Sequence, residues 1–196
     1  MPLTTFAPHA PTCGRPSRWL ARGLVLAACL PLAGVTASCT TASAIALQPT
    51  KVEVQRPLNG TVRVEATGSA RRAGIGSRAI GSDDLAHAVR GTLLASALSS
   101  GVVEGGEADH LLRVEVLSVE RSDLQLDMQA AISVRWTLLD GAGRVARWEE
   151  TVTTLGKATT FDAGMVEDRA RMALESATRK NIEEGLRRLG RRAGDI

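Results

Sequence analysis

Two histidines, His87 and His110, are the first candidates for chemistry in residues 39–196, which we call the body. Histidine side chains titrate near neutrality and bind metals, so either residue could serve acid–base catalysis or coordination. His87 follows Asp83 and Asp84 on a predicted helix, but ligands at helical spacing on one element do not make a metal site. A solvated helix face is the better interpretation. We interpret Asp109-His110 as a loop-to-strand junction rather than a catalytic pair.

Other motifs offer little chemistry. Gly74-Ile75-Gly76 departs from the dinucleotide-binding spacing, follows no buried strand and lacks the lysine of a phosphate loop, so it indicates a loop. No Gly-x-Ser-x-Gly nucleophile elbow is present. The adjacent acids Glu149 and Glu150 point to opposite faces of a predicted strand and cannot act as a pair. Glu150 falls on the apolar face beside Trp148, which indicates a sheet edge or a polar contact. We therefore predict no catalytic residue, no metal site, no cofactor and no enzymatic activity.

The residue with the clearest chemistry is Cys39. Arg15, Arg18 and Arg22 precede an apolar run, and no acid occurs before the cysteine. This is the charge order of an export signal. The run is shorter than the roughly 20 apolar residues of a transmembrane helix, and Pro31 interrupts it. Small residues come directly before Cys39, as in the box where bacterial lipoproteins are cut and lipidated. We predict lipidation at Cys39.

Two other cuts stay open. Leu26-Ala27-Ala28-Cys29 has the leucine that the Cys39 box lacks, although cutting there leaves a short apolar core. An ordinary small-x-small cut after Ala44 is the third choice. Cys13, Cys29 and Cys39 are the cysteines of the chain, so the body has no second cysteine for a disulfide or a thiolate metal site.

Composition excludes further classes. The chain has 24 basic and 21 acidic residues, and three of the arginines lie before Cys39, so the body is 21 to 21. A balanced body does not predict nucleic-acid binding. The body has no tyrosine and only Phe161, Trp136 and Trp148 as aromatics, too few for a base-stacking or sugar-stacking platform.

The first half of the body predicts two strands and a helix. Alternating valines favour strands at 51–55 and 61–66, joined as a hairpin by the turn residues 57–60. Residues 68–81 are rich in Gly, Ser and Arg and predict a loop. Ser82 is a good N-cap for a helix with Leu85, Val89, Leu93 and Ala97 on its apolar face, and Gly101 ends it.

The second half predicts three strands and a long helix. Residues 111–120 alternate, with a slip at 117–119 that indicates a bulge. Residues 128–139 and 144–155 form a hairpin in which Trp136 pairs with Trp148, and Gly143 takes a positive φ. After a loop at 157–164, residues 165–189 form a helix that Gly190 ends. Its apolar stripe comprises Val166, Ala170, Ala173, Leu174, Ala177, Ile182, Leu186 and Leu189.

These elements predict an α+β fold in two layers, with a mostly antiparallel sheet, two helices on one face and the order β-β-α-β-β-β-α. The predicted organisation is a signal peptide at 1–38, a lipidated tether at 39–50, a single domain at 51–190 and a frayed tail at 191–196. The basic residues near the end of the last helix, Arg179, Lys180, Arg187, Arg188, Arg191 and Arg192, are interpreted as a solvated face that complements the helix dipole.

The lipoprotein box, the segment SDDLAHAVRGTLLASAL, the strand LLRVEVLSV, the hairpin ISVRWTLLDGAGRVARWEETV and the last helix resemble small outer-membrane lipoproteins of Gram-negative bacteria. The resemblance covers about residues 81–189 and points to YajG-type lipoproteins or the lipoprotein of the lipopolysaccharide translocon. It implies a two-layer α/β domain without enzymatic activity, working in envelope assembly or maintenance. Thr40, in place of an acid after the cysteine, implies the outer membrane.

The expected function is thus a lipid-anchored, periplasm-facing module that binds an envelope protein or a lipid, with the membrane as its first partner. Two alternatives stay open at this point. One is an auxiliary lipoprotein of a lipid transporter that holds an acyl chain between sheet and helices. The other is an envelope enzyme with a noncanonical site.

Overall fold

The computed structural model describes residues 44–49, 51–68, 80–124 and 127–194. The chain divides into two units, Met1–Ala37 and Ser38–Ile196, and every described residue belongs to the second. The predicted signal peptide, Cys39 and residues 69–79 of the predicted loop lie outside the described residues.

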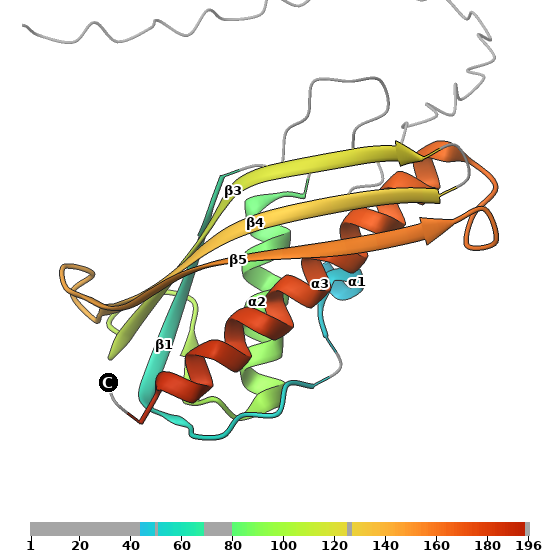
Figure 1. Cartoon of the computed structure of the whole chain (residues 1–196). Coiled ribbons are helices and arrows are strands. Elements are labelled where there is room, and N and C mark those ends of the chain that lie inside the picture. The colour runs from blue at the N-terminus through green and yellow to red at the C-terminus, as the bar shows by residue number, and fades with distance from the viewer. Residues whose placement is uncertain (1–43, 50, 69–79, 125–126, 195–196) are drawn as a thin grey trace, which may run out of the picture. The chain divides into compact units, whose positions relative to one another are not determined.

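A five-stranded sheet in the order β2-β1-β3-β4-β5 forms one layer (Figure 1). The strands are β1 (Leu58–Thr67), β2 (Ser99–Val103), β3 (His110–Leu124), β4 (Asp127–Asp140) and β5 (Ala146–Thr159). The long pairings β3–β4 and β4–β5 are antiparallel, whereas β1 runs parallel to both β2 and β3. β2 and β5 are therefore the two edges of the sheet.

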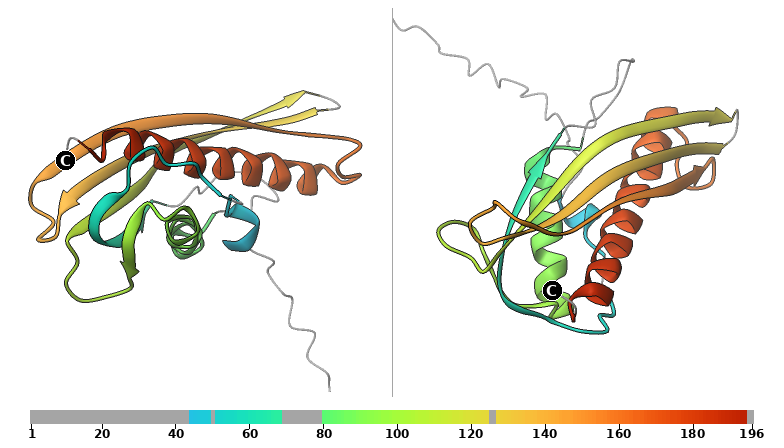
Figure 2. Two further views of the ribbon diagram at one scale, coloured as in Figure 1. Left: turned by 90° about the horizontal axis from the view of Figure 1, so that it is seen from below. Right: turned by 60° about the vertical axis from the view of Figure 1, so that its left-hand side comes forward.

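Helices α2 (Ser82–Ser96) and α3 (Val166–Arg192) cover the same face of the sheet, as Figure 2 shows from below. The short helix α1 (Ala44–Leu47) lies against both of them. The other face of the sheet carries a row of charges, in which Arg135 pairs with Glu115 and Glu149 across three strands. This arrangement confirms the predicted α+β class with the helices on one face.

Trp136 lies at the centre of the core and is fully buried. Two glycines let α3 approach the sheet closely. A Cβ at Gly185 would collide with the Trp136 ring. A Cβ at Gly156 would likewise collide with the α3 backbone at Ala173 and Ala177. The helix therefore packs directly on β4 and β5.

The hairpin of β4 and β5 exists as predicted, but its predicted register is wrong by two residues. Trp148 pairs with Leu138, and Trp136 pairs with Glu150. The register stays even, so the apolar faces still match. The irregularity between Leu138 and Leu139 accounts for one of these residues, since Leu139 pairs with Ala146. The other comes from a turn one residue longer than predicted, in which the Asp140 amide donates to the Val145 carbonyl oxygen. Gly143 has φ +71°, as predicted.

The first predicted strand and its hairpin are wrong. Residues 51–55 are not in a strand, although Val52 is buried. The Val52 amide donates to the Ser96 hydroxyl of α2 at 3.1 Å instead of to a strand. Leu58, predicted in the turn, begins β1 and pairs with Ser99 of β2, a strand that the sequence did not reveal. Alternation predicted which valines are buried but not where their backbone hydrogen bonds go.

The predicted helix ends also shift. Gly81, not Ser82, is the N-cap of α2, and the helix ends at Ser96 with Ala97 in the left-handed conformation. Gly101, the predicted stop, lies in β2.

The second half shows similar shifts. Gly190 does not end α3, which continues to Arg192. The glycine instead gives Val54 room, because a Cβ at this position would collide with the Val54 side chain. β5 extends to Thr159, into the predicted loop at 157–164. The predicted bulge in β3 is confirmed between Val116 and Ser118.

Candidate functional site

His87 lies exposed on α2. In the described parts of the chain, no group of three or more His, Cys, Asp or Glu residues could hold a metal ion. Asp83 and Asp84 occupy the first turn of α2, where the positive end of the helix dipole favours acids. The structure therefore gives these three residues a surface role on α2.

Asp109 and His110 do form a junction, and their polar atoms hold the start of β1. The Asp109 carboxylate accepts hydrogen bonds from the Thr61 amide at 2.7 Å and the Thr61 hydroxyl at 2.9 Å. These donors hold the pKa of Asp109 below its ordinary value, with the backbone amide as the largest cause. His110 lies at the start of β3, with Nε2 2.9 Å from the Asn59 carbonyl oxygen. Thr61 and Asn59 of β1 occupy the Asp109 carboxylate and His110 Nε2, as expected of a loop-to-strand junction, whereas His110 Nδ1 is buried without a hydrogen-bond partner among the described residues.

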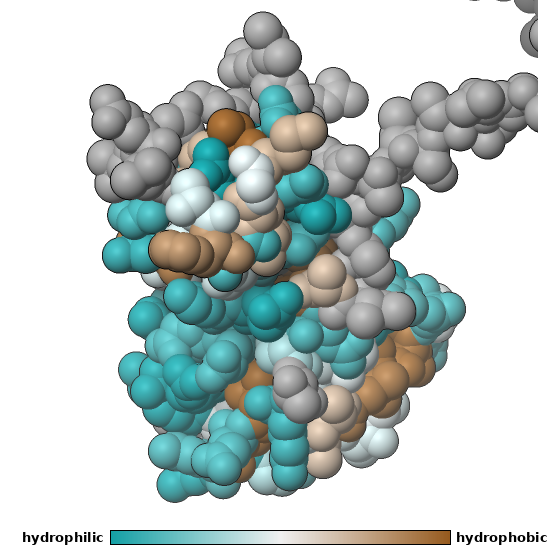
Figure 3. All heavy atoms as spheres, turned by 90° about the vertical axis from the view of Figure 1, so that its right-hand side faces the viewer, coloured by the Kyte–Doolittle hydropathy of each residue, from teal (hydrophilic) through white to brown (hydrophobic). Residues whose placement is uncertain are grey.

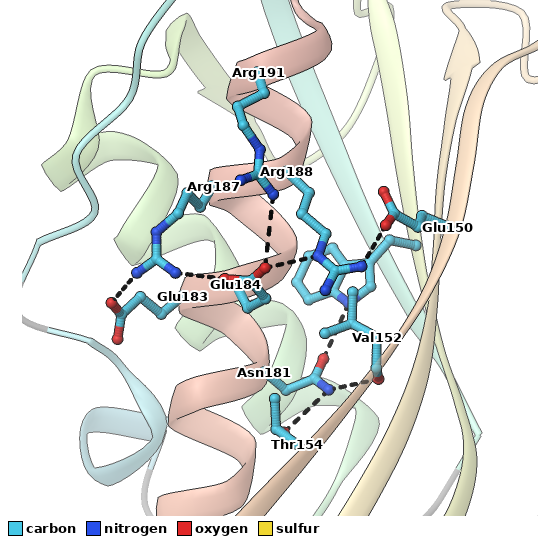
Figure 4. Close-up of polar contacts among 10 residues, drawn as sticks. Glu150, Val152, Thr154, Asn181, Glu183, Glu184, Arg187, Arg188 and Arg191 are labelled. Atoms are coloured by element: carbon cyan, nitrogen blue, oxygen red, sulfur yellow. Dashed lines mark hydrogen bonds and ion pairs between the residues drawn. The ribbon is translucent and has the colours of Figure 1, made fainter.

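The sequence predicted a sheet edge or a polar contact at Glu150, and the structure shows that its partner is Arg188. Glu150 sits on β5, the edge strand, and faces the helices, where it bonds Arg188 of α3 (Figure 4). Arg188 also donates from Nε to Glu184 at 2.7 Å. The Arg188 hydrogen bond is the largest cause that lowers the pKa of Glu184. An inward charge on an edge strand also discourages pairing with another chain.

Asn181 is the polar residue of the core that sequence reasoning missed. Its Oδ1 accepts from Trp136 Nε1 at 3.0 Å, and its Nδ2 donates to the Val152 carbonyl oxygen at 2.8 Å. Nδ2 also lies 3.2 Å from the Thr154 hydroxyl. Asn181 is 1% exposed and joins α3 to β4 and β5 (Figure 4). The sequence held one signal for this contact. Asn181 is an amide that falls within the predicted apolar stripe of the last helix, seven residues before Arg188.

The basic residues at the end of α3 have partners rather than an open anion site. Arg187 bonds Glu183 and Glu184, and Arg191 lies 3.7 Å from Glu184. Earlier in the helix, Arg179 donates to the Ala46 carbonyl oxygen and Lys180 to that of Leu155. These contacts modify the predicted solvated face, because the same side chains also attach α1 and β5 to α3.

The predicted apolar stripe of α3 is confirmed except at its start. Val166 is 53% exposed, whereas the other seven members are buried. The buried positions instead include Arg169, at 8% exposed, and Asn181. The stripe leaves the core at the beginning of α3, where Phe161, Met165 and Val166 are all exposed.

Taken together, the polar clusters position backbone and helices. The polar atoms of Asp109, Glu150 and Asn181 named above form hydrogen bonds to another strand or helix of the fold. Among the described helices, none combines the length and apolar character that a membrane crossing requires.

Comparisons with known proteins give the fold. No family model matches the sequence, and a search of curated proteins finds no match. A protein of Xanthomonas campestris from the family DUF330 superposes with TM-score 0.55 at 15% identity, covering 76% of this chain and 95% of that one. A hypothetical protein of Chlamydia trachomatis gives TM-score 0.53 at 10% identity, covering 70% and 99%. These two similarities show a shared fold.

Bacterial lipoproteins are among the solved structures that the search finds. The minor lipoprotein of Acinetobacter baumannii matches with TM-score 0.45 at 16% identity, covering 69% of this chain and 91% of that one.

Proposed function

We propose that this chain is a lipid-anchored lipoprotein of the bacterial envelope that faces the periplasm and acts as a non-catalytic binding or assembly module. Its anchor is the lipidated Cys39, and its location is the outer membrane. Its partner is an envelope protein or a lipid. In this proposal the chain is of the same kind as YajG-type lipoproteins or the lipoprotein of the lipopolysaccharide translocon, which its sequence resembles.

The observation that carries the proposal is the position of Cys39. An export-type apolar run ends in small residues and Cys39, and Ala44, where α1 begins, follows five residues later. Leu47 is fully buried, and Arg179 of α3 holds the Ala46 carbonyl oxygen. The predicted lipid site therefore comes directly before a chain segment that is fastened to the folded body.

The non-catalytic part of the proposal rests on how the candidate residues are used. The Asp109 carboxylate and His110 Nε2 contact neighbouring backbone, and Glu150 pairs with Arg188. General acid–base catalysis needs a group that can reach a substrate proton. We assign these side chains to holding the fold.

The experiment compares Cys39→Ala with Cys29→Ala, which serves as the matched control. In the parent bacterium, we expect Cys39→Ala to abolish metabolic acyl labelling and to release the protein from membranes, whereas Cys29→Ala should leave both unchanged. Labelling that persists in Cys39→Ala and disappears in Cys29→Ala contradicts the assigned anchor.

A second arm tests the absence of catalysis. The double variant His87→Gln, His110→Gln is expected to stay folded, anchored and able to support envelope integrity, measured as resistance to detergent. Loss of that resistance at a normal level of folded, anchored protein overturns the non-catalytic assignment.

A further inference from the structure

One end of the molecule presents large apolar side chains to solvent. Phe161 is 100% exposed, Met165 68% and Val166 53%, and all three lie within six residues. We call residues 160–166, which connect β5 to α3, the apolar corner. Scattered single apolar residues are ordinary on protein surfaces, but a group of this kind calls for an explanation. Figure 3 views this end, where hydrophobic areas alternate with hydrophilic ones.

Phe161 is held out by an ordered turn. The Asp162 carboxylate accepts from the Thr159 amide at 2.6 Å and the Thr159 hydroxyl at 2.9 Å, and the Asp162 amide donates to the Thr159 carbonyl oxygen at 3.1 Å. The Phe161 amide lies 3.3 Å from the same Thr159 hydroxyl. Because hydrogen bonds already order the turn before any binding, the entropic cost of fixing the Phe161 ring in a complex is small.

The apolar corner lies near the root of the predicted tether. Arg179 contacts Ala46 from α3, and thirteen residues separate Arg179 from Val166, which is about 20 Å of helix. Four residues lie between Cys39 and Ala44, so the two positions are at most about 18 Å apart. Figure 1 shows α1 and the β5–α3 connection toward the same side of the molecule. A body tethered this closely brings the corner within reach of the membrane.

We propose that the apolar corner inserts Phe161, with Met165 and Val166, into the headgroup–acyl boundary of the membrane to which Cys39 anchors the chain. This inference rests on the proposed function. The acids Asp162, Glu167 and Asp168 flank the apolar side chains in the sequence, and Asp168 also pairs with Arg171. Insertion into a zwitterionic surface fits these acids, whereas an anionic surface would repel them. The contact orients the body, with the β4–β5 turn pointing away.

The test uses the full chain, lipidated at Cys39 and reconstituted in phosphatidylethanolamine–phosphatidylcholine vesicles. The body contributes no other cysteine, so Met165→Cys supplies one free thiol for the polarity-sensitive fluorophore NBD. Val145→Cys is the matched control, because Val145 is also exposed, at 51%, and directly precedes β5 at the end of the strand opposite to the corner. A strand of this length spans about 43 Å. Vesicles with and without nitroxide-labelled acyl chains report contact with lipid.

We expect the probe at residue 165 to shift to the blue and to lose intensity in nitroxide vesicles, while the probe at residue 145 does neither. Adding Phe161→Asp to the Met165→Cys chain removes the quenching. An anchored protein whose probe at residue 165 stays unquenched overturns the inference. A blue shift without quenching also overturns it and assigns the corner to contact with a second copy of the chain. Flotation of the vesicles separates these results from failure of the anchor, since a chain that does not float contradicts the proposed function itself.

Discussion

Replacing Asn181 with alanine tests whether one buried amide fixes α3 to the sheet. The change leaves the Trp136 Nε1–H without its acceptor and removes the donor to the Val152 carbonyl oxygen. A buried polar group left without a partner costs about 1–3 kcal/mol, and a lost neutral hydrogen bond costs about 0.5–1.5 kcal/mol. We therefore expect Asn181→Ala to lower the free energy of unfolding by about 2–4 kcal/mol.

Trp136→Phe isolates the hydrogen bond from the rest of the amide. It removes the Nε1–H but keeps an aromatic ring against Gly185, so it leaves the Asn181 Oδ1 unpaired. If the two side chains act through their bond, the double variant loses less than the sum of the single losses. We expect a coupling of about 1 kcal/mol between the two changes.

The assay is urea unfolding of the four proteins, followed by far-ultraviolet circular dichroism so that the loss of a tryptophan does not disturb the signal. Equal m values across the set permit the comparison of free energies. A cost of Asn181→Ala below about 0.5 kcal/mol, the range of surface substitutions, would refute the reasoning. So would coupling within the roughly 0.3–0.5 kcal/mol expected of independent sites.

Two further predictions concern packing and acid stability. Gly156→Ala puts a methyl group against the Ala173 backbone, which no rotamer change can relieve, and should cost at least about 1–3 kcal/mol. Gly164→Ala, which meets nothing within 4 Å, should change stability by less than about 1 kcal/mol, and equal urea midpoints for the two variants would contradict this account. The amide of Arg144 is the largest cause that holds the pKa of Asp140 below its ordinary value, so this carboxylate stabilises the fold above pH about 4 and loses its contribution as the pH falls further. Asp140→Asn should therefore flatten the acid side of the stability profile, and a profile parallel to that of the parent protein would speak against this role.

The sequence alone was enough for the fold class and for the hairpin of β4 and β5. Period-two alternation places Ile132, Val134, Trp136 and Leu138 on one face, and all four are buried. A local pattern determines which face of a strand turns inward, because side chains alternate by geometry. The same reasoning located the bulge in β3 and the positive φ of Gly143. It also singled out Glu150 as a sheet-edge or polar position.

Only the tertiary structure decided the partners of these elements. The parallel neighbours of β1 and the loss of the first predicted strand depend on contacts between residues distant in sequence. The pairing of Trp148 with Leu138 depends on the irregularity and the turn within the hairpin. Gly190 shows why local signals fail, since glycine favours a helix end in isolation but here allows α3 to pack against Val54. Asn181 shows the same for a site. The sequence alone does not show which group a single amide in an apolar stripe bonds. Packing brings Asn181 to the indole of Trp136, and packing determines hydrogen-bond partners that lie far apart in sequence.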